Sequence, residues 1–227
     1  TADRRHDAER DPRRSELPEQ KGEVPSGTET GARRVTPAQL TDRLDFDVSR
    51  ETYERLSAYH DLLLTWSKTH NLIGPKERDE IWERHILDCL RVWPLVSSGE
   101  DVMDIGSGAG LPGIILAACS EGGQTFHLVE SNAKRCAFLR HVSRELDLPV
   151  NVVNDRVESV SRETFSHITA RAVADLTLLI TLSEKWLEKS AIGVFLKGRN
   201  WKTELTEALR YWNFNQGASE LIQDLSG

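Results

Sequence analysis

Short apolar runs alternate with longer amphipathic stretches over the second half of the sequence. The runs have the length of strands buried in a parallel sheet, and the stretches between them have helical periodicity. Because the two alternate, we expect a mostly parallel sheet with right-handed crossovers. The predicted strands are 102–105, 125–129, 149–153, 167–170 and 193–196, with a candidate sixth at 218–225, and the predicted helices are 114–117, 133–146, 175–187 and 201–212.

Apolar positions spaced three and four apart predict an all-helical segment before the sheet. Thr36 and Pro37 are typical of an N-cap followed by proline in the first turn, and Ser49 has the same capping role for the next helix. A further helix is predicted over about 78–93, ended by Pro94. We therefore expect a helical cap at 35–97, followed by a Rossmann-like domain at 98–227.

The first 34 residues have a different composition. Acidic and basic side chains alternate there, prolines recur and apolar residues are almost absent, which predicts a disordered tail. The tail is electrically neutral, so the net charge of −7 belongs to the rest of the chain. A basic RNA-binding arm is therefore a weaker interpretation of this tail than a solvated extension.

The cysteines argue against a metal site and against secretion. Cys89, Cys119 and Cys136 are odd in number, have no metal-ligand spacing and lie in apolar helical contexts. No apolar run approaches the length of a membrane span, and no signal peptide is visible. We expect a cytoplasmic protein with reduced thiols and without a metal.

A glycine-rich stretch, DVMDIGSGAGLPG at 101–113, follows the first predicted strand. It is not a Walker loop, and Leu111 stands where a dinucleotide loop has its third glycine. Pro112 removes one N–H from the helix start, and Asp104 would repel a pyrophosphate. The loop suits a nucleoside that has positive charge and no phosphate, as S-adenosylmethionine does. The alternative is a tight turn that binds no ligand.

Charged side chains follow the later strands. Glu130 ends the second strand, where an acidic residue holds the hydroxyls of a ribose, and the polar turn 154–158 follows the third strand, beside an adenine edge. Arg171 and Lys197 end the fourth and fifth strands and place positive charge on the acceptor side. No Asn/Asp-Pro-Pro-aromatic loop and no cysteine lies near the fourth strand. A ring nitrogen such as guanine N7 needs neither, because alignment of its lone pair suffices.

From about 53 to 199 the chain resembles the GidB/RsmG family of small-subunit ribosomal RNA guanine-N7 methyltransferases. The shared stretches are NL at 71–72, RHILD at 84–88, DIGSGAGLPG at 104–113, KRCAFL at 134–139, RVE at 156–158, ARA at 170–172 and LKG at 196–198. The resemblance implies a class I S-adenosylmethionine-dependent methyltransferase fold. It also implies methyl transfer to N7 of a guanine in the 530 loop of 16S ribosomal RNA. The expected partner is this RNA or a small-subunit assembly particle, and the expected state is a monomer.

The predicted site combines both lines of reasoning. By resemblance, the cofactor contacts are Gly106, Leu111, Val157, Glu158 and Arg171; the loop and strand ends add Gly108, Gly110 and Glu130. Arg171 is the predicted catalytic residue, in a positioning role without a general base, with Lys197 and His85 as further candidates. Structural alternatives remain open, since His85 could be a hydrogen-bonded helix residue, Lys197 a strand-end charge and Asp88 a partner of Arg84.

Three further expectations concern RNA, the chain end and other functions. With a net charge of −7, RNA binding needs a local basic patch, predicted at Lys134, Arg135, Arg140, Arg199 and Lys202. The family usually adds a last antiparallel strand beyond the point where this chain ends, so a C-terminal strand is expected to be missing. The alternatives are a methyltransferase of another substrate, a nicotinamide-dependent oxidoreductase and a fold that serves only as an interaction module.

Overall fold

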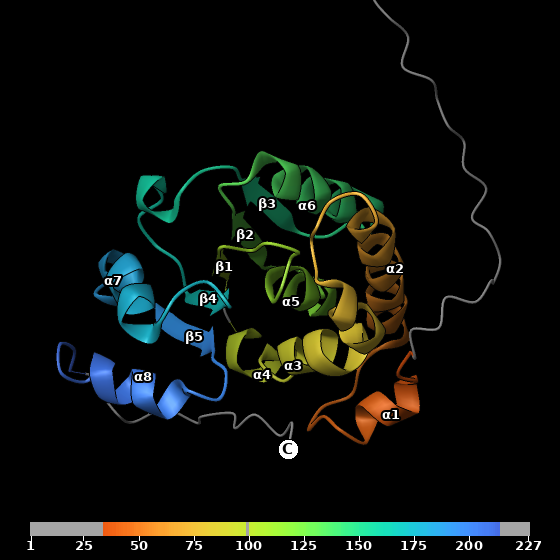
Figure 1. Cartoon of the computed structure of the whole chain (residues 1–227), viewed down its shortest axis with the longest axis horizontal. Coiled ribbons are helices and arrows are strands. Elements are labelled where there is room, and N and C mark those ends of the chain that lie inside the picture. Colours follow the sequence, from red (N-terminus) through yellow and green to blue (C-terminus); the bar gives the residue numbers. More distant parts are fainter. Residues whose placement is uncertain (1–33, 99, 214–227) are drawn as a thin grey trace, which may run out of the picture. The chain divides into compact units, whose positions relative to one another are not determined.

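Five parallel strands form one sheet in the computed structural model, which describes residues 34–98 and 100–213. Their order is β3-β2-β1-β4-β5 (Figure 1). All five predicted strands are confirmed; the three inner strands are mostly buried, as apolar runs predict, whereas the two edge strands are partly exposed. The candidate strand 218–225 lies outside the described residues. The bounds are β1 Asp101–Ile105, β2 Thr125–Val129, β3 Val150–Val153, β4 His167–Arg171 and β5 Ile192–Leu196.

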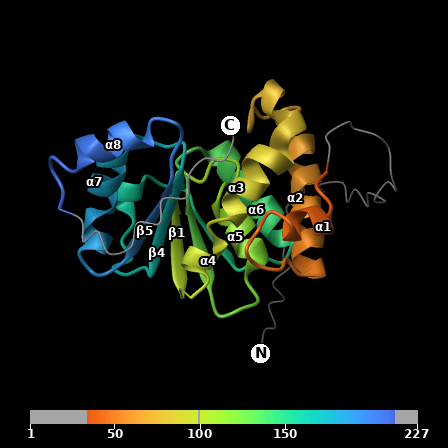
Figure 2. The ribbon, with the colours of Figure 1, turned by 90° about the horizontal axis from the view of Figure 1, so that it is seen from below.

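Helices cover both faces of this sheet (Figure 2). On one face lie α5 (Gly113–Cys119), α6 (Ala133–Glu145) and the long α2 (Arg50–Ser67). On the other lie α7 (Leu176–Leu187), α8 (Trp201–Ala208) and the short 3₁₀ turn η3 (Val157–Ser159). Each layer buries its own apolar cluster against the sheet, and the larger cluster joins the helices before β1 to α5 and α6. The Rossmann-like α/β class is therefore confirmed.

The helices before β1 wind differently from the sequence prediction. After α1 (Pro37–Thr41) and α2 come a 3₁₀ helix η1 (Pro75–Glu80), a π-helix η2 (Ile81–Ile86) and the short helices α3 (Leu87–Leu90) and α4 (Trp93–Val96). The prediction of one helix over 78–93 that ends at Pro94 is wrong. Pro94 lies in the first turn of α4, where its missing N–H costs no hydrogen bond.

Other local predictions agree with the structure to within one helical turn. The side chains of Thr36 and Ser49 cap α1 and α2 by accepting from the backbone N–H of Gln39 and Thr52. The helix predicted over 201–212 ends at Ala208, followed by a turn. The three cysteines are free and buried, as predicted. Within 34–98 and 100–213, no helix is long and apolar enough to cross a membrane.

Candidate functional site

The glycine loop between β1 and α5 has positive φ at three glycines, of which Gly106 and Gly108 differ in their surroundings. Gly106 has φ +64° and Gly108 has φ +56°, in the left-handed region that side chains rarely adopt. A Cβ on Gly106 would lie 2.7 Å from the Val173 side chain, whereas one on Gly108 would meet nothing closer than 3.6 Å. Packing explains the glycine at 106. The open space beside Gly108 leaves bare backbone for a ligand.

Glu130 follows β2 and turns its carboxylate toward this loop. It accepts the N–H of Gly108 at 3.0 Å and the N–H of Asn132 at 2.7 Å, and Arg135 lies 3.7 Å away. The residue is only 5% exposed. Each carboxylate oxygen can accept more than one hydrogen bond, so Glu130 retains capacity for the hydroxyls of a ribose. The remaining acceptor capacity of Glu130 and the open loop therefore fit a nucleoside.

Asp104 lies beneath the loop and has a different environment. Its carboxylate accepts the hydroxyl of Thr169 at 2.9 Å and the N–H of Gly113 at 3.3 Å, and it is 1% exposed. Burial raises the pKa of Asp104 to about 7. The side chain therefore ties β1 to β4 and to the start of α5.

The remaining predicted cofactor residues lie around the same sheet edge. Gly110 has φ +93° and donates its N–H to Ser107, and Leu111 packs half-buried against the α5 side. Val157 is buried in η3 and Glu158 beside it is exposed. The binding roles of these residues stay predictions.

Arg171 ends β4 and reaches the helices before β1. Its guanidinium donates to the backbone oxygen of Arg84 at 2.7 Å and to Nδ1 of His85 at 2.9 Å. Cys89 Sγ and a carboxylate oxygen of Asp88 lie 3.6 and 3.9 Å from it. The structure thus brings two predicted catalytic residues, Arg171 and His85, together.

Lys197, at the end of β5, has other partners. Its ammonium donates to the backbone oxygen of Ala174 at 2.6 Å and pairs with Glu204 of α8 at 2.7 Å. Glu204 also accepts the N–H of Leu176 at the start of α7. Lys197 therefore holds the turn after β4 from the other side of the sheet.

Tyr59 forms a hydrogen bond to the glycine loop that the sequence did not predict. It is fully buried in α2, and its hydroxyl donates to the backbone oxygen of Ala109 in the glycine loop at 2.8 Å. The sequence showed only its place in the apolar stripe of that helix. The bond joins the cap to the loop directly.

The predicted basic patch occupies two separate helices. Lys134, Arg135 and Arg140 lie exposed on α6, which follows β2, whereas Arg199 and Lys202 lie exposed around the start of α8, which follows β5. The two groups thus flank the carboxyl ends of the strands from opposite faces of the sheet. Their role in RNA binding stays a prediction.

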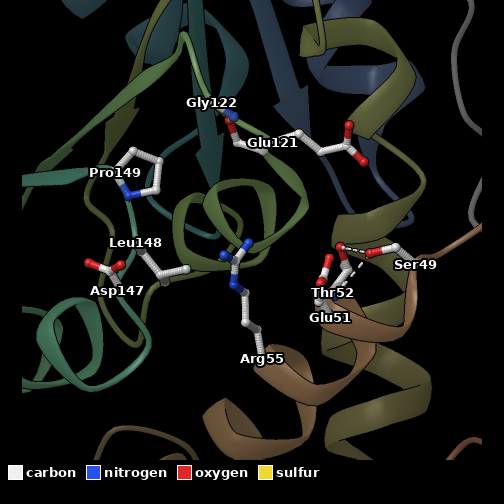
Figure 3. A pocket seen from close by; sticks show the side chains of 10 residues that line it. Ser49, Glu51, Thr52, Arg55, Glu121, Gly122, Asp147, Leu148 and Pro149 are labelled. Carbon is white, nitrogen blue, oxygen red and sulfur yellow. Dashed lines mark hydrogen bonds between the residues drawn. The ribbon is translucent and has the colours of Figure 1, made fainter.

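A surface cavity of about 620 Å³ lies elsewhere, at the amino ends of the strands (Figure 3). It is lined by residues of the α2 start, of the turn after α5 and of the turn before β3, with the Arg55 side chain extending between them. None of the predicted site residues lines it. Ligands of open α/β sheets bind at the carboxyl ends, so this cavity is not the candidate site.

The family model and the sequence relatives of this chain carry the same description. The family model described as rRNA small subunit methyltransferase G (GidB) matches residues 52–227. The ribosomal RNA small subunit methyltransferases G of Paramagnetospirillum magneticum and Hyphomonas neptunium are 41% and 44% identical to this chain. The matches cover 79% and 80% of this chain and 87% and 86% of theirs. The solved structure of cofactor-bound Rv0187 from MTB is 13% identical, covers 78% of this chain and 85% of its own, and has a TM-score of 0.49.

Proposed function

This chain belongs to the GidB family, rRNA small subunit methyltransferase G, and on that premise we propose that it transfers a methyl group from S-adenosylmethionine to N7 of a guanine in 16S ribosomal RNA. The observation that carries the proposal is the match over 52–227, which includes the loop, Glu130, Arg171 and Lys197. The target expected within that RNA is the 530 loop.

The cofactor side is formed by the loop and the ends of β2 and β3. Glu130 accepts the ribose hydroxyls, and the open backbone at Gly108, flanked by Gly106 and Gly110, lies against the nucleoside. Val157 and Glu158 border the adenine, and Leu111 packs beside it. When bound, S-adenosylmethionine supplies an electrophilic methyl group on a positively charged sulfur.

The acceptor side needs alignment more than proton transfer. N7 of guanine has a free lone pair, so no proton has to leave before the bond to the methyl carbon forms. Arg171 is a guanidinium that only donates hydrogen bonds, and it acts by fixing the end of β4 against the cap. Lys197 positions the turn after β4 through Ala174. Together they keep the acceptor in line with the methyl group.

The partner is small-subunit ribosomal RNA, free or in an assembly particle. The chain acts as a monomer in the cytoplasm, and the basic side chains on α6 and α8 contact the RNA backbone on either side of the cleft. Phosphate contacts of this kind make binding fall with salt.

The test is methyl transfer by the purified full chain. It is incubated with labelled S-adenosylmethionine and either deproteinised 16S RNA or isolated small subunits, and 7-methylguanosine is mapped by mass spectrometry. We expect one new 7-methylguanosine in the 530 loop. Calorimetry with S-adenosylmethionine and with NAD accompanies it. Binding of NAD alone would favour an oxidoreductase, and cofactor binding without transfer to either RNA would favour an interaction module.

A further inference from the structure

The contact between Arg171 and His85 determines which ring nitrogen of His85 carries a proton. A guanidinium can only donate, so Nδ1 of His85, 2.9 Å from Arg171, must accept with its lone pair. Burial and the charge of Arg171 lower the pKa of His85, so the ring is neutral at pH 7. A neutral ring that accepts at Nδ1 carries its single proton on Nε2.

The nitrogen that carries this proton has no partner in the described part of the chain. Nε2 of His85 is buried and forms no hydrogen bond there. Buried N–H groups in proteins nearly always have an acceptor. His85 also lies in the π-helix η2, a winding that is frequent at functional sites. The unsatisfied N–H therefore points to an acceptor that a ligand supplies.

His85 is held beside the cofactor loop by the end of β4. Ala170 pairs with Ile105, so Arg171 and Gly106 leave neighbouring strands side by side. Val173, two residues further, lies against Gly106. Ala172, between Arg171 and Val173, has φ +55°, a strained conformation for alanine that is typical of functional turns. The ring of His85 is thus fixed at the end of β4, the strand that runs beside the one leading into the cofactor loop.

We propose that Nε2–H of His85 donates to O6 of the target guanine and that Arg171 locks the tautomer that permits this. The inference rests on the proposed function. On the edge that carries N7, guanine presents the acceptor O6, whereas adenine presents an amino donor. A ring nitrogen fixed as a donor therefore forms a hydrogen bond with guanine and meets a second donor on adenine, so it selects guanine. Solvent does not reach Nε2 in this structure, so donation to O6 requires the side chains that cover it to move.

The tautomer can be measured without any reaction. Nitrogen-15 NMR of the histidine-labelled full chain distinguishes a protonated from an unprotonated ring nitrogen, and His85→Gln assigns the resonance. We expect a neutral His85 with its proton on Nε2, and loss of this fixed tautomer in Arg171→Met. A proton on Nδ1, or a doubly protonated ring at pH 7, would overturn the lock.

The specificity is tested with three substrates that differ only in the target base. Guanine and inosine both carry O6, whereas 2-aminopurine keeps N7 and lacks O6. The measured quantity is kcat/KM for guanine or inosine divided by kcat/KM for 2-aminopurine. We expect this ratio to be at least about tenfold larger for the parent chain than for His85→Phe. Comparing this ratio between variants cancels the different nucleophilicity of the bases. His141→Phe, on the outer helix α6, is the matched control and keeps the parent ratio.

Each outcome has a distinct meaning. The same ratio in His85→Phe and the parent overturns this inference and leaves the proposed function intact. If His85→Phe transfers no methyl group, the ratio is measured as competition for RNA binding, with the same expectation. Absence of transfer to guanine by the parent chain overturns the proposed function, and this inference with it.

Discussion

The carboxyl edge of the sheet consists of two halves that are built differently. In the cofactor half, Glu130 bonds to backbone N–H groups 22 and 2 residues away in the sequence. In the acceptor half, the bonds of Arg171 join groups 82 to 87 residues apart. The first half is a property of one loop and its flanking strands, whereas the second exists only when the cap is packed on β4. Substitutions should therefore separate cofactor affinity from methyl transfer.

The largest effect is expected for Arg171→Lys. Lysine keeps the charge and loses the planar fork that reaches Arg84 and His85 together. We expect kcat/KM for RNA to fall about a hundredfold, corresponding to roughly 3 kcal/mol. Because the guanidinium is bonded to the cap, the cofactor contact predicted for residue 171 should not need it, and S-adenosylmethionine affinity should stay within about threefold of the parent. Single-turnover transfer and calorimetry measure the two quantities.

Arg210→Lys is the matched control for that change. Arg210 follows α8, is exposed and pairs with Glu207, so its loss should leave transfer unchanged. Normal transfer by Arg171→Lys would contradict the division into halves and make Arg171 a purely structural charge.

Glu130→Gln should have the opposite pattern. The amide keeps one acceptor and loses the charge that strengthens hydrogen bonds to hydroxyl and N–H groups. S-adenosylmethionine affinity should fall tenfold to a hundredfold, about 1.5–3 kcal/mol, while transfer at saturating cofactor stays near the parent rate. Calorimetry reads the affinity, with Glu145→Gln on the exposed end of α6 as control. An unchanged affinity would show that the ribose lies elsewhere.

Gly108→Ala probes the open space beside the loop. A methyl group there meets no protein atom closer than 3.6 Å, so the protein loses only about 1–2 kcal/mol for the left-handed backbone. We expect cofactor affinity to fall at least about tenfold, because the methyl group enters the nucleoside's space. Gly122→Ala, at a positive-φ turn with no atoms nearby, loses stability without losing affinity. If both variants bind alike, the nucleoside does not contact residue 108.

The smallest effect is the pH dependence of stability that Asp104 contributes; Asp104 and Glu130 are the two carboxylates of the cofactor half. The pKa of Asp104 is raised to about 7 from 3.8, so the folded chain favours its protonated form. That stabilisation is lost as pH rises through 7, and the contribution of Asp104 to the unfolding free energy should fall by about 1 kcal/mol between pH 6.5 and 8.0. The histidines with shifted pKa values are shifted downward, so they add stability of the opposite sign over this window, up to about 0.4 kcal/mol each; they are His60, His85, His127 and His167.

Urea titrations at both pH values measure this slope, and Asp104→Asn should remove it. The asparagine variant provides the comparison because it cannot titrate. Parent and asparagine variant keep the same histidines, so a parent that loses no stability relative to Asp104→Asn between pH 6.5 and 8.0 would contradict the raised pKa of Asp104.

The cofactor half could be predicted from sequence because its determinants are local. The strand before the loop, the glycines and Glu130 follow from apolar runs and from backbone geometry that neighbouring residues set. The acceptor half could be predicted only as a set of strand-end charges. That Arg171 meets the cap depends on packing between segments 87 residues apart. That Lys197 meets Glu204, seven residues further on, depends on how α8 folds back after β5. A resemblance to a family suggested the residues and left their partners open.

The winding of the cap was beyond prediction for a related reason. A π-helix adds one residue to a turn, so Leu87 bonds back to Trp82, without changing the apolar pattern that indicates a helix. The hydroxyl of Tyr59 is similar. Its stripe position predicts burial, but the acceptor on Ala109 is chosen by tertiary structure.

The buried thiol beside Arg171 makes the acceptor half open to chemical measurement. Cys89 is fully buried with a pKa raised to about 12, and Cys119, at the end of α5, also has a pKa of about 12. Neither thiol can be alkylated while covered, because the reactive form is an exposed thiolate. The alkylation rate of Cys89 therefore reports how often the cap separates from β4. Cys119 serves as an internal reference in the same molecule. The ratio of the two alkylation rates therefore measures the opening of the acceptor half without an introduced probe.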